Sequence, residues 1–104
     1  MTTRAHLTPR AAEGLHRIVH SVAEQFGAAV AERVVDQLEH AFEQLAANPG
    51  IGHRRDDLTL EADVRFWSVG PTLIAFRVRQ DRIEILCIEL GQRDWVSLLR
   101  THLG

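Results

Sequence analysis

Two apolar stripes of helical spacing, separated by a single glycine, restrict the possible folds of this chain more than any other feature. Thr8 and Pro9 suit the N-cap and the first position of a helix, which is predicted to continue to Gly27. A second helix is predicted for residues 28–47, and Asn48-Pro49-Gly50 ends it. Two amphipathic helices with so short a connection form an antiparallel hairpin, and both stripes need a shared surface to cover. The stripes consist of Leu15, Ile18, Val19, Val22 and Phe26, then Val30, Val34, Leu38, Ala41, Phe42 and Leu45.

Three strands are predicted after the hairpin, at Val64–Val69, Thr72–Arg79 and Arg82–Leu90. Their two-residue connections, Gly70-Pro71 and Gln80-Asp81, imply antiparallel pairing. Residues 3–8, TRAHLT, are predicted to form a further, N-terminal strand. The fold class is therefore α+β in the order β-α-α-β-β-β, with the helical hairpin packed on one face of a C-terminal antiparallel sheet. We expect residues 1–104 to form a single domain.

The last predicted strand is apolar on both faces, because Ile85, Leu86, Cys87 and Ile88 follow one another directly. One face of this strand can pack under the helices. The other needs a cover, and two candidates exist. The cover is either the weakly helical segment 94–103 of the same chain or another protein.

Composition and patterning exclude several classes of protein. No apolar run among the 104 residues approaches the roughly 18 residues that a membrane helix needs. The first residues, MTTRAHLTPR, lack the apolar core of a signal peptide, so a cytoplasmic protein is expected. The formal net charge of −2 gives no general attraction to nucleic acid, and no specific DNA binding by the chain alone is expected. The lone Cys87 is interpreted as a small buried hydrophobic residue.

No self-sufficient catalytic or metal-binding pattern is present. His16 and His20 are four residues apart, with Glu13 and Glu24 nearby, and a solvated helix face explains them better than a metal site does. The chain has no G-x-S-x-G nucleophile motif, no phosphate-binding loop and no dinucleotide fingerprint, so no metal or cofactor is expected.

Arginine dominates the chemistry of the second half of the chain. All 12 basic residues are arginine, and eight of them follow residue 50. In one interpretation they form a recognition surface, because the planar guanidinium suits phosphates and carboxylates. In the other they pair with acidic residues on adjacent strands. Both interpretations stay open for Arg77, whereas pairing is favoured for Arg79 and Arg82. Arg77 and Arg79 share a face by the period of two, and Arg65 joins them if the strand register permits. Arg54 and Arg55 precede Asp56 and Asp57 directly, which favours local self-pairing or solvation of the two carboxylates.

The order of elements and four stretches of sequence resemble the RelE/ParE superfamily of bacterial type II toxin–antitoxin toxins. The resemblance is closer to the ParE branch, the plasmid stabilisation proteins. It covers nearly the whole chain, and its most specific stretches are LTPRAAEGLHRI, LAANPGIGHRRDDL, VRFWSVGPTLIAFRV and IEILCIELGQRDW.

The resemblance implies a partner. Toxins of this superfamily are held inactive by a cognate antitoxin, here one similar to ParD, whose extended or helical segment wraps a groove on the toxin. That segment is a candidate cover for the second apolar face of the last strand. The residues expected to bind the antitoxin or the target are Arg54, Arg55, Arg65, Trp67, Leu73, Arg77, Leu86, Ile88, Arg93 and Trp95.

The branches of the superfamily differ in activity. RelE-like toxins cut ribosome-bound messenger RNA with basic side chains and often a C-terminal tyrosine. A cutting site here would use Arg65, Arg77 and Arg93 with His53. The chain departs from that pattern, since it has no tyrosine and no lysine, Gln92 stands where a histidine is usual, and Ser97 falls near the tyrosine position. ParE-like toxins poison DNA gyrase by binding, which needs no catalytic group. The resemblance therefore favours a non-enzymatic gyrase inhibitor. The alternatives are a ribosome-dependent endoribonuclease and a degenerate member that keeps only antitoxin binding.

Overall fold

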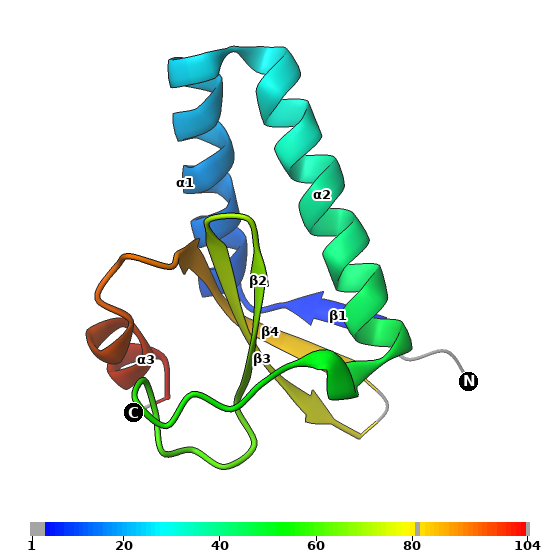
Figure 1. Ribbon diagram of the computed structural model, residues 1–104, viewed down its shortest axis with the longest axis vertical. Coiled ribbons are helices and arrows are strands. Elements are labelled where there is room, and N and C mark those ends of the chain that lie inside the picture. The colour runs from blue at the N-terminus through cyan, green and yellow to red at the C-terminus, as the bar shows by residue number, and fades with distance from the viewer. Residues whose placement is uncertain (1–3, 81, 104) are drawn as a thin grey trace.

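The computed structural model describes residues 4–80 and 82–103, with side chains placed within residues 5–100 of these ranges. A helical hairpin, α1 (Pro9–Phe26) and α2 (Ala28–Ala47), packs on a four-stranded sheet (Figure 1). The Thr8 hydroxyl accepts a hydrogen bond from the Ala11 amide at 3.1 Å, as its N-cap role predicts. Gly27 joins the helices with a φ of +93°, a conformation that side-chain-bearing residues rarely adopt. The predicted bounds of both helices are confirmed.

The sheet has the order β1-β4-β3-β2. Its strands are β1 (Arg4–Leu7), β2 (Arg65–Val69), β3 (Thr72–Arg79) and β4 (Arg82–Leu90). The β2–β3 and β3–β4 pairs are antiparallel, as predicted, and β1 adds to the edge of β4 in parallel. The predicted α+β class is confirmed. The predicted start of the first strand at Thr3 lies outside the described residues.

The helices bury one face of the sheet, which we call the helix face. Its core consists of Ala11, Ile18, Leu38, Ala41, Leu45, Ile74, Phe76, Ile83, Ile85 and Ile88. Gly14 lets α1 approach β4 closely, because an added Cβ would lie only 2.1 Å from the Ile88 carbonyl oxygen. Phe26, predicted to be part of the buried stripe, is 66% exposed, because the far ends of both helices extend beyond the sheet (Figure 1).

A β-bulge in β4 explains its four consecutive apolar residues. Ala75 pairs with Cys87 and Phe76 pairs with Ile85, so Leu86 is the extra residue of the pair. Leu86 and Cys87 therefore both belong to the core on the other side of the sheet, which we call the reverse face. Ile88 returns to the helix face.

The chain covers part of its own reverse face. The third helix, α3 (Trp95–Leu103), and the loop before β2 form a second core there, whose members are Leu58, Val64, Phe66, Leu73, Ala75, Leu86, Cys87, Trp95 and Leu99. The Trp95 ring meets Phe66 edge to face at 6.0 Å between centroids, and its Nε1 donates to the Leu90 carbonyl at 2.9 Å. Asp94 accepts hydrogen bonds from the Ser97 hydroxyl at 2.8 Å and the Ser97 amide at 3.3 Å, and these bonds lower the pKa of Asp94. Of the two candidate covers, the structure shows the segment 94–103 of the same chain, and residues 85–88 of β4 are all buried within the chain itself.

The segment NPGIGHRRDDL turns the chain from the hairpin into the sheet. A short 3-10 helix, η1 (Pro49–Ile51), follows α2. Gly52 is buried against the Phe76 ring, with no room for a side chain. His53 then exchanges two backbone hydrogen bonds with Phe66, of 2.9 and 2.7 Å, which fix the loop to β2. None of the helices in the described ranges is both long and apolar enough to span a bilayer.

Candidate functional site

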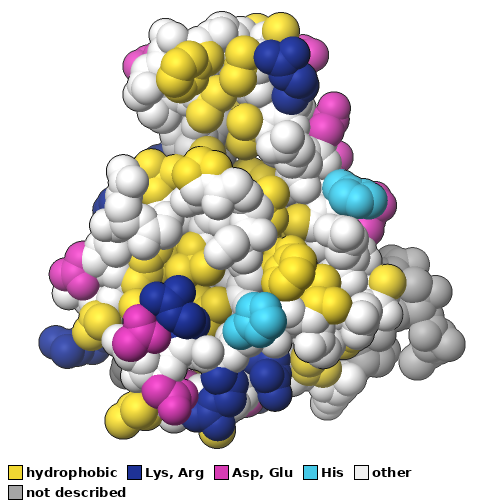
Figure 2. Space-filling view, viewed as in Figure 1, with side chains coloured by type: hydrophobic (Ala, Val, Ile, Leu, Met, Phe, Trp, Pro, Cys, Tyr) yellow, Lys and Arg dark blue, Asp and Glu magenta, His cyan; other side chains and the backbone are white. Residues whose placement is uncertain are grey.

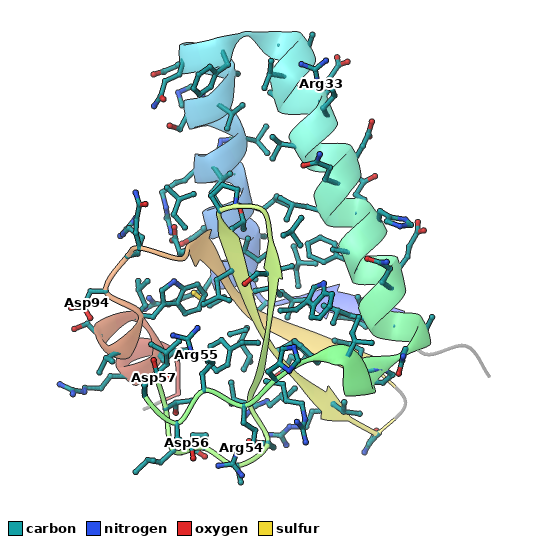
Figure 3. All side chains as sticks on the ribbon, in the orientation of Figure 1. Arg33, Arg54, Arg55, Asp56, Asp57 and Asp94 are labelled. Atoms are coloured by element: carbon teal, nitrogen blue, oxygen red, sulfur yellow. The ribbon has the colours of Figure 1, made fainter. Side chains whose placement is uncertain are left out.

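The two loop arginines pair with their own neighbours. Arg54 donates to Asp56 at 2.9 Å, and Arg55 donates to both carboxylate oxygens of Asp57 at 2.9 and 2.8 Å (Figure 3). The Arg55 hydrogen bonds lower the pKa of Asp57, and the same contact raises the pKa of Arg55. All four side chains are exposed, which confirms the predicted self-pairing in a solvated loop.

His53, Arg65 and Trp67 gather on the helix face beside β2. Arg65 and Trp67 are two residues apart on the strand and so share a face. The exposed His53 ring stacks on the half-buried Trp67 ring, with 5.9 Å between centroids and 29° between planes. Within the described ranges, no acidic side chain forms an ion pair with Arg65. This cluster therefore presents a cation and two stacked rings at one edge of the sheet.

Arg77 lies on the opposite face. Arg65 pairs with Phe76, whose ring is part of the helix-face core, so Arg77 must point to the reverse face. There its Nε donates to Glu84 on β4 at 2.8 Å. The register does not permit Arg65 to join Arg77 and Arg79 on one face, because it places Arg65 opposite Phe76 rather than opposite a reverse-face residue.

Arg93 belongs to a third location, at the end of β4. Its guanidinium lies 3.5 Å from the carboxylate of Glu89, which also accepts a hydrogen bond from Arg17 on α1. Glu89 is only 3% exposed, so the two arginines neutralise a buried acid between α1 and the exit of β4. The proposed cutting set of Arg65, Arg77, Arg93 and His53 is thus divided among three places and does not form one constellation.

Four apolar residues expected to bind a partner are buried in the chain itself. Leu73, Leu86 and Trp95 belong to the reverse-face core under α3, and Ile88 lies under the helices. Their exposures are at most 5%, so they offer no surface to a partner in this conformation. Sequence reasoning assigned them to an open face because it did not include the bulge or the docking of α3.

The exposed apolar surface lies instead on the helical hairpin. A shallow groove runs between α1 and α2 beyond the sheet, lined by Val19, Ala23, Ala28, Ala31, Glu32, Val35 and Asp36. Figure 2 shows further hydrophobic side chains near the free ends of the two helices, on the face turned toward the viewer. The sequence analysis missed the groove. Its signal is the small side chains of Ala23, Ala28 and Ala31, which do not fill the space between the two helices.

The described residues do not gather the groups that a metal or a thiol nucleophile needs. No cluster of three or more histidine, cysteine or acidic side chains suited to a metal ion occurs within them. Cys87 is 2% exposed, and burial raises the pKa of its thiol to about 12, so the thiol stays protonated at neutral pH. The interpretation of Cys87 as a buried hydrophobic residue is confirmed.

Comparison with known proteins identifies the family. A family model described as the ParE toxin of the type II toxin–antitoxin system parDE matches residues 5–95. The chain belongs to the ParE toxin family. It is 31% identical to toxin ParE3 of Caulobacter vibrioides over 85 residues, which are 82% of this chain and 83% of ParE3. The predicted resemblance to the ParE branch of the superfamily is confirmed.

Two solved structures share the ParE fold. The chromosomal ParDE toxin–antitoxin system from P. aeruginosa matches with a TM-score of 0.71 and 23% identity, over 86% of this chain and 96% of that chain. The RelBE2 toxin–antitoxin complex from Mycobacterium tuberculosis matches with a TM-score of 0.59 and 20% identity, over 90% and 94% of the two chains. At these identities the matches establish the fold, and the family match makes this ParE chain a toxin of a type II toxin–antitoxin system.

Proposed function

We propose that this toxin is neutralised by a ParD-like antitoxin and that it inhibits DNA gyrase in the cytoplasm by binding to it. The family match over residues 5–95 is the observation on which the proposal chiefly rests. The division of Arg65, Arg77 and Arg93 among three places supports binding over cutting, because phosphodiester cleavage needs its acid, base and charge-stabilising groups around one phosphate.

The groove between α1 and α2 suits an apolar helical segment of the antitoxin. Its walls are alanine and valine side chains, and Glu32 and Asp36 line the same groove. An amphipathic helix with an apolar stripe and basic flanks complements both features. Each partner then buries a surface that is costly to leave in water.

A direct test of the groove compares two adjacent alanines at the start of α2. Ala28 lines the groove and Ala29 is exposed outside it. Negative charge is favourable at a helix N-terminus, so a glutamate at either position leaves α2 folded and the two variants are expected to be equally stable. We expect Ala28→Glu to weaken antitoxin binding at least tenfold in a titration, because a charge is buried in the contact, while Ala29→Glu changes it little. Equal effects of the two variants would argue against the groove.

One observation favours the cutting alternative. The Arg65 guanidinium and the exposed His53 imidazole lie at the same edge of the sheet, with Trp67 available for stacking. An imidazole can transfer protons at neutral pH, and an arginine can stabilise a phosphate. This cluster is the only part of the predicted cutting set that the structure brings together among the described residues.

Expression from an inducible promoter separates these functions. Cells that lack the antitoxin are induced, and plasmid topology and transcript integrity are then measured. We expect growth arrest, loss of negative supercoiling and intact transcripts, with rescue when the antitoxin is co-expressed. Cleaved transcripts with normal supercoiling would support the endoribonuclease, and unimpaired growth would support the degenerate, antitoxin-binding member.

A further inference from the structure

Arg79 and Arg82 face each other across the turn between β3 and β4. Their Cα atoms are partners in the register, and both side chains are exposed. Directly opposed side chains have Cβ atoms about 5 Å apart, and like charges in such positions repel. Within the part of the chain that the structure describes, neither forms an ion pair, so the pairing expected for them is wrong. Asp81, in the turn, lies outside the described residues.

The neighbouring positions extend this basic surface. Arg77 lies two residues before Arg79 and therefore on the same reverse face, next to its partner Glu84. The partner of Glu84 on β1 is His6, which is exposed. Arg77, Arg79 and Arg82 thus oppose one described acid on the part of the reverse face that α3 leaves open, in a chain whose formal net charge is −2.

We propose that Arg77, Arg79 and Arg82, which we call the arginine face, form a docking surface for an acidic polypeptide segment. The proposal rests on the proposed function: the antitoxin would carry this acidic segment in addition to the apolar helix proposed for the hairpin groove. The guanidinium fork binds carboxylates with two parallel hydrogen bonds. Alternate residues of an extended segment are about 6.6 Å apart, which is the spacing of Arg77 and Arg79 along β3. Acidic residues at alternate positions therefore match the arginine face.

Charge distribution favours a short acidic segment over nucleic acid. The arginine face covers only two strands, β3 and β4, at the turn end of their hairpin. Elsewhere on the protein, α2 presents the acidic residues Glu32, Asp36, Glu39 and Glu43. A long polyanion would meet this repulsion outside the arginine face, and a short segment would not.

Replacement of Arg79 and Arg82 is expected to change binding and stability in opposite directions. In the free protein Arg79 and Arg82 repel each other, so Arg79→Gln with Arg82→Gln relieves a destabilising contact and raises the melting temperature. The same variant removes two guanidinium groups that pair with no acid in the described ranges, and it weakens binding of an acidic segment roughly tenfold. A purely structural role for these arginines predicts a lower melting temperature instead.

The experiment uses the whole protein and three labelled probes: a short peptide of alternating glutamate and serine, the same peptide with glutamine, and a single-stranded oligonucleotide of equal length. Fluorescence anisotropy at low and high salt measures binding to the wild type, to the double variant, and to a control with Arg33→Gln and Arg100→Gln, two exposed arginines of α2 (Figure 3) and α3. We expect salt-sensitive binding of the glutamate peptide that the double variant loses and the control keeps. Four results would overturn the proposal. The glutamine peptide could bind as tightly as the glutamate peptide, or the oligonucleotide could bind more tightly than it. The control could lose as much binding as the double variant, or no probe could bind at all.

A second arm uses the purified antitoxin and keeps the two proposals distinguishable. Antitoxin that binds the wild type and the double variant equally, at both salt concentrations, would overturn the arginine face and leave the proposed function standing. Antitoxin that does not bind the wild type at all would overturn the proposed function, and the peptide arm would then decide the arginine face alone.

Discussion

Arg65 and Arg77 lie on opposite faces of the sheet, although they occupy neighbouring strands. Arg65 is the register partner of Phe76, and Arg77 is the next residue along β3. A single bound phosphate cannot contact both side chains through the sheet. The two arginines are therefore expected to contribute independently to whatever the toxin binds.

A double-mutant cycle tests this independence. We expect the effects of Arg65→Ala and Arg77→Ala on binding of a target or antitoxin to add within about 0.5 kcal/mol, because the residues share no partner. Arg77→Ala is also expected to lower the free energy of unfolding by roughly 0.5–1 kcal/mol through loss of the half-buried Glu84 pair. A coupling energy well above 1 kcal/mol would show that both arginines act on one group.

Gly14→Ala is expected to destabilise the protein strongly. The new Cβ would lie 2.1 Å from the Ile88 carbonyl oxygen, so α1 must move away from β4. Overpacking of this kind costs roughly 1–3 kcal/mol, and more where backbone has to move. Gly50→Ala is the matched control, because its Cβ would meet only the Asn48 side chain at 3.5 Å. Chemical denaturation measures both, and equal stabilities would contradict the close contact.

Trp95→Ala is expected to uncover the reverse face. The indole is 2% exposed, and its loss leaves a cavity against Phe66 and removes the hydrogen bond to Leu90. Truncation of a buried aromatic residue of this size costs roughly 3–5 kcal/mol. Val96→Ala, at a neighbouring side chain that is 40% exposed, serves as the control with little effect. Binding of a dye that reports exposed apolar surface should rise only in the Trp95 variant, and no rise there would contradict α3 as the cover.

Alkaline pH is expected to destabilise the fold through Cys87. Burial raises the pKa of the folded thiol from 9.0 to about 12. Below pH 9 both states hold the proton, so this group does not make stability depend on pH. Between pH 9 and about 12 the unfolded thiol ionises first, and the free energy of unfolding falls by up to roughly 1.4 kcal/mol per pH unit. The chain has no lysine and no tyrosine, so few other groups titrate in this range. Cys87→Ala should flatten the decline measured by urea denaturation, and an unchanged slope would contradict the shift.

The helices and strands could be predicted because their signals are local. Thr8 and Pro9 mark the start of α1, Gly27 separates the helices, and both strands of the β3–β4 hairpin have the bounds that the turn at residues 80–81 predicts. The parallel partnership of β1 with β4 joins residues far apart in the chain, and no local pattern specifies it.

The surfaces could not be predicted because they depend on one bulge and one docked helix. Strict alternation along β4 places Leu86 and Ile88 on one face, but the extra residue at Leu86 sends Ile88 to the helix face. Leu58 and Val64 gave no strong signal, yet they complete the cover of the reverse face together with α3. The basic loop residues were easier to interpret, because Arg54 and Arg55 each pair with the aspartate two positions later in the sequence.

A supercoiling assay with purified components tests the central claim most directly. DNA gyrase, relaxed plasmid and ATP are mixed with the toxin, with the toxin and its antitoxin together, or with the Ala28→Glu and Ala29→Glu variants. We predict that the toxin inhibits supercoiling in proportion to its concentration, that the antitoxin restores it, and that Ala28→Glu toxin resists this rescue while Ala29→Glu toxin does not. Full supercoiling at toxin concentrations well above those of gyrase, with a folded toxin confirmed by circular dichroism, would contradict the account.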